Sequence, residues 1–175
     1  NRNELLAVRY LPPLEQAVNT ITLIGLIWAV APTVARFPRF IELVVFLLTL
    51  ATGVVYIVFA LDWSRRTSTA AYNSDFQATV WGASQLILLV AGVGLVLMGR
   101  GRDWLLRLFT LLPLLAAHFI HQWNYPEFFI VETEVPYLIR LGQLIAFPLL
   151  TVVAYRHVLG ELTQPTLITR TPSAP

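Results

Sequence analysis

Residues 40–61, FIELVVFLLTLATGVVYIVFAL, hold one charged side chain, Glu42, in an otherwise largely apolar run. A hydrocarbon core of roughly 30 Å needs about twenty helical residues to cross it, and this segment is long enough. Because an unpaired backbone amide is costly in lipid, the segment is predicted to be an α-helix. Similar runs follow or precede it at 17–35, 78–98, 104–123 and 137–158. The chain is therefore predicted to be an all-α integral membrane protein, a bundle of five transmembrane helices with short loops.

The composition of the whole chain agrees with a membrane domain. Hydrophobic residues make up 57% of the chain and charged residues 13%, whereas soluble domains carry about 25% charged residues. The basic residues, all arginine, form no stripe that would suggest nucleic acid. Cysteine is absent, which excludes disulfides and thiolate metal sites. The expected partners are the lipid bilayer and other membrane helices, in a homo- or hetero-oligomer.

Three regions are expected along the chain. Residues 1–16 mix charged and apolar side chains and are expected to form an interfacial segment, a short helix stopped by Pro12-Pro13. Residues 17–158 form the five-helix domain, in which Pro113 and Pro148 are expected to kink the fourth and fifth spans. Residues 159–175 are expected to form a C-terminal linker or tail, because their end is rich in threonine and proline.

The distribution of arginine predicts the orientation in the membrane. Five crossings place the two termini on opposite sides. Seven arginines fall on the side of the C-terminus and five on the side of the N-terminus. The positive-inside rule therefore places the C-terminus in the cytoplasm and the N-terminus outside.

Two histidines near the outer end of the fourth span are candidates for binding. His118 and His121 are three residues apart and so share a helix face. A pair of imidazoles can contribute to a metal or cofactor site, but no cysteine exists and no carboxylate follows at helical spacing. The two histidines are therefore weak metal candidates, no metal site is predicted, and hydrogen bonds to neighbours or headgroups are the simpler interpretation.

A polar pocket is a second hypothesis for the same leaflet. Arg140 lies about one turn inside the fifth span, where a charge costs up to roughly 3 kcal/mol unless it has a partner or reaches the headgroups. Asp62, Glu132 and Glu134 are expected near the same depth. The hypothetical ligand or sensing pocket comprises His118, His121, Arg140, Gln143, Asp75, Gln77 and Gln85. The sequence also allows each of these groups to face the headgroups separately.

The sequence carries no recognisable catalytic motif. It contains no GxxxxGK[ST], HExxH or GxSxG. Its acidic residues form no close pair within a predicted span. No enzymatic activity is expected, and no cofactor is predicted.

Several segments together point to a known kind of membrane region. LPPLEQAVN (11–19) opens the first span, DFQATVWGASQL (75–86) opens the third, and HFIH (118–121) lies near the end of the fourth. YLIRLGQLIAFPLL (137–150) forms most of the fifth span and is followed by AYR (154–156). In this order they resemble the multi-pass membrane input region of certain bacterial sensor histidine kinases, which precedes cytoplasmic GAF, PAS and kinase domains.

This resemblance covers nearly the whole chain and has functional implications. It implies a non-catalytic membrane sensor or anchor in the bacterial inner membrane, with a cytoplasmic C-terminus. The fifth span, with Arg140, Gln143 and Pro148, would pass motion to a downstream domain. The chain departs from the family pattern because no phosphoacceptor histidine region, ATP-binding lid or GAF domain follows Pro175. Kinase activity is therefore not implied for these residues.

A different class of function is also compatible with the sequence. The chain could be a small structural subunit of a larger respiratory or photosynthetic membrane complex. The small residues of the second and third spans would allow close packing against other helices. A haem, chlorin or quinone is expected only under this alternative.

Overall fold

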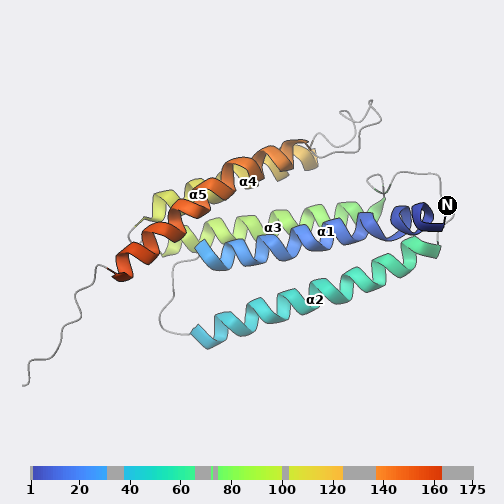
Figure 1. The fold of residues 1–175 in the computed structure, drawn as a ribbon, viewed down its shortest axis with the longest axis horizontal. Coiled ribbons are helices and arrows are strands. Elements are labelled where there is room, and N and C mark those ends of the chain that lie inside the picture. The colour runs from blue at the N-terminus through green and yellow to red at the C-terminus, as the bar shows by residue number, and fades with distance from the viewer. Residues whose placement is uncertain are drawn as a thin grey trace, which may run out of the picture.

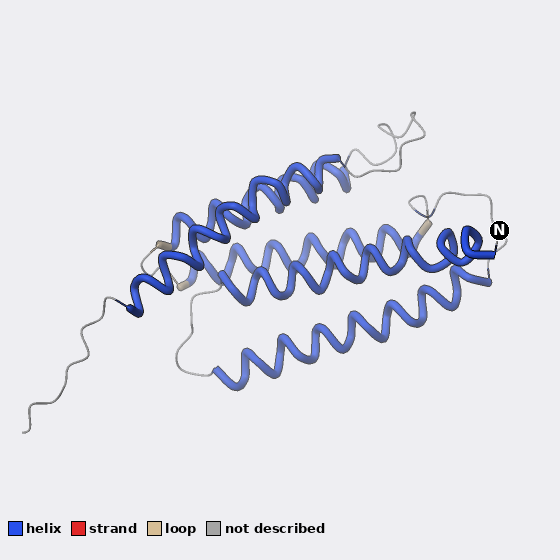
Figure 2. The backbone as a smooth tube through the Cα atoms, in the orientation of Figure 1, coloured by secondary structure: helices blue, strands red, loops and turns tan. Residues whose placement is uncertain are grey.

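The computed structural model describes residues 2–30, 38–65, 72, 75–99, 103–123 and 137–162. Within these ranges the chain forms long α-helices and no strand (Figures 1 and 2). The helices are α1 (Arg2–Val30), α2 (Pro38–Arg65), α3 (Phe76–Met98), α4 (Trp104–Trp123) and α5 (Tyr137–Leu162). All five are long and apolar enough to cross a membrane. The all-helical fold with five candidate spans is therefore confirmed.

The first helix differs from the expectation drawn from its prolines. α1 begins at Arg2 and continues through Pro12 and Pro13 instead of stopping there. Each proline removes one backbone N–H, but its fixed φ is compatible with a helix, so the flanking hydrogen bonds can carry the helix on. In Figure 1 the first turns of α1, in the darkest blue, lie out of line with the rest of the helix. An interfacial position for residues 1–16 stays a prediction.

The other helices follow their predicted spans with small shifts at the ends. α4 has the predicted bounds, α2 extends to Arg65 and α5 extends to Leu162. α3 begins after Asp75, whose Oδ1 accepts a hydrogen bond of 2.9 Å from the backbone N–H of Gln77. This bond satisfies one of the free N–H groups at the start of the helix. α4 and α5 contain Pro113 and Pro148 as internal residues, and their predicted kinks stay predictions.

The helices are arranged around α1 and α3. α1 packs against α2 and α3, α3 packs against α4, and α4 packs against α5. Figure 1 shows α4 and α5 as a pair on one side of α1 and α3, with α2 on the other side. α3 buries one face along its length, which is the expected pattern of a central helix. That face carries Gln77, Trp81, Gln85, Leu89, Gly92 and Val96.

The apolar core joins four of the helices and leaves out α2. α1, α3, α4 and α5 contribute Leu23, Leu26, Val30, Leu89, Val96, Leu111, Leu114 and Ala146. α2 is attached by a second cluster of Ala17, Trp63, Tyr72 and Trp81, which lies where α2 ends and α3 begins. The two clusters therefore hold different ends of the bundle.

Most of the apolar surface faces outward. Only 11% of the α2 span is buried within the protein, against 39% for the span of α1. Large exposed side chains on α2 include Phe40, Leu43, Phe46, Leu47, Leu50, Val54, Ile57 and Val58. A water-soluble monomer rarely exposes a continuous apolar surface of this extent, and these helices are therefore expected to contact lipid.

Candidate functional site

A buried glutamine on α3 joins two helices. The Gln85 side chain is 1% exposed. Its Nε2 donates to the backbone O of Gln16 (3.3 Å), to Gln16 Oε1 (3.1 Å) and to Thr20 Oγ1 (3.1 Å). An amide in an apolar surrounding is costly unless it is hydrogen-bonded. The hydrogen bonds of Gln85 therefore favour one rotation of α3 and one position along its axis relative to α1.

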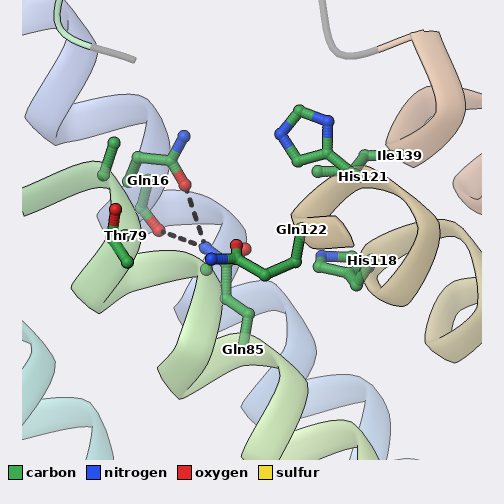
Figure 3. A pocket seen from close by; sticks show the side chains of 9 residues that line it. Gln16, Thr79, Gln85, His118, His121, Gln122 and Ile139 are labelled. Atoms are coloured by element: carbon green, nitrogen blue, oxygen red, sulfur yellow. Dashed lines mark hydrogen bonds between the residues drawn. The ribbon is translucent and has the colours of Figure 1, made fainter. Parts of the chain in front are cut away.

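A pocket lies beside this glutamine, between α3 and α4. Its volume is about 30 Å³, which is room for about two water molecules. Figure 3 shows the lining side chains and the hydrogen bonds between Gln16 and Gln85. The lining consists of Gln16 from α1; Ala78, Thr79, Gly82 and Gln85 from α3; His118, His121 and Gln122 from α4; and Ile139 from α5. The pocket thus takes residues from four helices.

Burial distinguishes the floor of the pocket from its rim. Gln85, His118 and Ile139 are buried and form the floor. Thr79 is exposed, and Gln16, His121 and Gln122 are half-buried, so these four form part of the rim. The pocket is partly open, and its deepest polar groups are the Gln85 amide and the His118 imidazole.

The two ring nitrogens of His118 have different hydrogen-bonding roles. Its Nδ1 lies 2.8 Å from the backbone O of Leu114. A carbonyl oxygen can only accept, so Nδ1 carries the proton. A charged imidazolium in an apolar surrounding is costly, which favours the neutral ring with a lone pair on Nε2. Among the described residues, this buried Nε2 has no hydrogen-bond partner.

Gln122 crosses from α4 to α3. Its side-chain Oε1 lies in the space that a Cβ at position 82 would occupy, so the contact depends on Gly82. In Figure 3 the Gln122 side chain extends from its helix toward Gln85. His118, His121 and Gln122 lie at spacings of three and four residues and therefore share one face of α4.

The structure brings together only part of the polar set predicted from the sequence. Gln85, His118 and His121 line the pocket. Arg140 is exposed and Gln143 is half-buried, and neither lines it. The neighbouring residue on α5, Ile139, faces the pocket instead. Glu132 and Glu134 lie outside the described residues.

Asp75 and Gln77 belong to a separate junction between α2 and α3. Gln77 Nε2 donates to Asp62 Oδ2 at 2.8 Å. Asp75 caps the start of α3. Close by, the rings of Trp63 and Tyr72 meet edge to face with centroids 4.9 Å apart. This polar and aromatic junction attaches the end of α2 to α3.

Sequence reasoning did not identify Gln16, Thr20, Thr79, Gly82 or Gln122. The expected helix stop at Pro12-Pro13 separated Gln16 from the first span. A continuous α1 places Gln16 and Thr20 one turn apart on one face, where both can meet Gln85. Gln122 follows His118 by four residues. That spacing places both side chains on one face of α4 and could have identified Gln122 from the sequence.

Polar contacts also join the helices at the opposite end of the bundle. Arg107 Nη1 donates to the backbone O of Val30 at 3.3 Å, so it satisfies a carbonyl at the end of α1. Arg156 on α5 pairs with Asp103, just before α4, at 2.8 Å. α5 is therefore linked to the start of α4 at this end.

The two histidines do not form a metal centre with other ligand side chains of the described chain. In those residues no three histidine, cysteine, aspartate or glutamate side chains gather closely enough to hold a metal ion. Comparison with known proteins finds no matching family model, no matching curated protein and no matching solved structure.

Proposed function

We propose that this membrane protein is a non-catalytic sensor or anchor module, the input region of a bacterial sensor histidine kinase. The observation that carries the proposal is the pocket shared by α1, α3, α4 and α5. A group that binds there contacts both the central helices and the α4–α5 pair. Binding that favours one spacing of these helices over another would shift their equilibrium.

The contact between α4 and α5 supports transmission from this pocket. A Cβ added at Gly142 would lie 2.8 Å from Ala117 Cβ and 3.0 Å from the backbone O of Pro113. The helices thus touch almost backbone to backbone, one turn below the pocket residues His118 and Ile139. The Arg156–Asp103 pair joins them again at the far end. A displacement of α4 is therefore expected to move α5 with it.

The chemistry of the lining supports a binding role over a catalytic one. No aspartate, glutamate, lysine, arginine or cysteine is among the residues that line the pocket. General acid–base catalysis commonly uses a positioned carboxylate, lysine or histidine that reaches the reacting group. Here the buried histidine has no acidic partner in the lining that would orient it for such chemistry.

A distance measurement at the far end of the bundle tests the proposal. Since the chain has no cysteine, Met98→Cys and Val158→Cys can carry two spin labels on exposed positions of α3 and α5. The change at the pocket is Gly82→Leu, which places a side chain where Gln122 lies. We expect the interlabel distance to change by about 1–2 Å, the size of helix shifts in signalling proteins.

The matched control for this measurement is Gly53→Leu. A Cβ at Gly53 has nothing within 4 Å, so this variant adds the same side chain without touching the pocket. We expect its distance distribution to equal that of the labelled parent. Identical distributions for Gly82→Leu and the parent would contradict transmission through α5. A reading frame continuing beyond Pro175 into signalling domains would add independent support.

A second candidate is a small structural subunit of a larger respiratory or photosynthetic complex. The observation in its favour is the exposure of α2, whose apolar face can pack against another protein's helix as well as against lipid. A resident haem, chlorin or quinone belongs to this candidate. Co-purification with redox subunits, or pigment absorbance that is lost in His118→Phe or His121→Phe, would favour it over the sensor.

A further inference from the structure

His118, on the floor of the pocket, carries an unused hydrogen-bond acceptor. His118 is 3% exposed, its Nδ1–H is used by Leu114, and its Nε2 has no partner among the described residues. A buried acceptor left unsatisfied loses its hydration without gaining a hydrogen bond in return. A ligand that places an O–H or N–H group against Nε2 therefore gains more here than at an exposed histidine.

The lining also restricts the charge of that ligand. The polar lining residues are glutamines, a threonine and histidines, and no aspartate, glutamate, lysine or arginine is among them. A cation or anion entering this pocket would lose its hydration without meeting an opposite charge. A neutral ligand does not lose that stabilisation, so the pocket favours an uncharged donor.

Size and shape restrict the ligand further. A volume of about 30 Å³ admits a hydroxyl group at the floor but no complete ring. The rest of the ligand must therefore lie at the open rim. There the methyl of Ala78 and the half-buried ring of His121 offer an apolar and aromatic surface. A flat aromatic body suits such a rim better than a hydrated one.

We infer that the pocket binds the hydroxyl group of a neutral, membrane-soluble phenol or hydroquinone. The hydroxyl donates to His118 Nε2, the ring lies at the rim beside His121 and Ala78, and the Gln122 amide is available to the hydroxyl oxygen. A phenolic hydroxyl has a lower pKa than water and is therefore a stronger hydrogen-bond donor. It can therefore supply the hydrogen bond that Nε2 does not receive from the described residues.

The inference rests on the proposed sensor function only for the reason why a ligand would bind. The chemical class of the ligand follows from the residues that line the pocket. The test uses the whole chain in lipid nanodiscs with ¹⁵N-labelled histidine, so that the His118 Nε2 signal reports the hydrogen bond directly. The probes are decylhydroquinone, its dimethyl ether and decylbenzoquinone. They share an apolar tail and ring, but only the first has hydroxyl donors.

We expect decylhydroquinone to shift the His118 Nε2 signal saturably. The ether and the benzoquinone should bind at least about tenfold more weakly, since they leave the acceptor unsatisfied. Equal shifts with all three probes would overturn the inference, as would a missing shift with the hydroquinone. A parallel shift at His157, which lies outside the pocket, would show general partitioning and would also overturn it.

Variants distinguish a change in the pocket from a change elsewhere in the helix bundle. In His118→Phe, where the signal of His121 at the rim serves as the reporter, the shift caused by the hydroquinone should be lost. Gln122→Leu, which keeps His118 as the reporter, should weaken binding several-fold. His157→Phe, an exposed position on α5, should bind like the parent. Unchanged affinity in Gln122→Leu and His118→Phe would contradict the inference. Because binding is read at the histidines of the pocket, a negative result leaves the Met98–Val158 distance test of the sensor proposal unaffected.

Discussion

Gly142 shows how one missing side chain sets the spacing of two helices. Its Cα faces α4 at a point where a Cβ would approach Ala117 Cβ, the Pro113 carbonyl oxygen and Leu114 Cα. Two of these three atoms belong to the backbone, so a side-chain rotation cannot make room. In a bilayer, helix association depends on such close packing, because lipid tails are as apolar as the side chains they would replace.

We expect Gly142→Ala to lower the free energy of unfolding by about 1–3 kcal/mol, the usual cost of overpacking. The matched control is Gly94→Ala on α3, where a Cβ meets nothing within 4 Å. That variant should leave stability unchanged or raise it by up to about 1 kcal/mol. Unfolding of both proteins with SDS in mixed micelles gives the comparison. Equal free energies of unfolding for the two variants would show that α4 and α5 can move apart at Gly142 with little loss of stability.

At the scale of single residues, the sequence predicted part of the site. Gln85, His118 and His121 stand out as polar groups within apolar runs, and each lines the pocket. Arg140 stands out equally, yet it is exposed and Ile139 faces the pocket. Adjacent residues on a helix point about 100° apart. The rotation of α5 is determined by the Gly142 contact with α4, which the polarity of Arg140 does not reveal.

Among the helices, α2 contacts α3 where α2 ends and α3 begins. The ring of Phe59 on α2 contacts two rings on α3 edge to face. Its centroid lies 5.8 Å from that of Trp81 and 6.4 Å from that of Phe76. The hydrogen bond from Gln77 to Asp62 lies in the same region. Toward its first turns, α2 lies farther from α3 and from the α4–α5 pair (Figure 1). Its position therefore depends on a few aromatic contacts in addition to its packing on α1.

We expect Phe59→Ala to destabilise the protein by about 1–3 kcal/mol, since Phe59 makes two aromatic pairs and each contributes about 0.5–1.5 kcal/mol beyond its buried area. Phe46→Ala is the matched control on the same helix, because Phe46 is 62% exposed. Its loss should change stability by less than about 0.5 kcal/mol. The same SDS titration measures both, and a similar loss in the two variants would contradict a specific attachment at Phe59.

The helices themselves were predictable because each depends on local composition. About twenty apolar residues in sequence must satisfy their backbone groups internally wherever lipid surrounds them. The one clear error was the stop at Pro12-Pro13, since α1 continues through both prolines. A proline weakens a helix locally, but the helical turns on either side and packing against α2 and α3 can outweigh that loss.

The orientation of the whole molecule is a prediction that the arginine distribution makes, with seven on the C-terminal side and five on the other. We expect green fluorescent protein fused after Pro175 to fluoresce and alkaline phosphatase fused there to be inactive, as for a cytoplasmic C-terminus. Alkaline phosphatase inserted between residues 66 and 71 should be active. The reverse pattern would place the N-terminus in the cytoplasm.

At the scale of the whole chain, the sequence by itself determined the helices that are long and apolar enough to span a membrane, because apolar length is a local property. Only the tertiary structure decided which polar groups meet. Gln85 finds Gln16 and Thr20, while Arg140 stays outside the pocket. The physical reason is that such meetings depend on the rotation and spacing of each helix. Those are determined by close contacts between distant segments, such as Gly142 with Ala117 and Gly82 with Gln122.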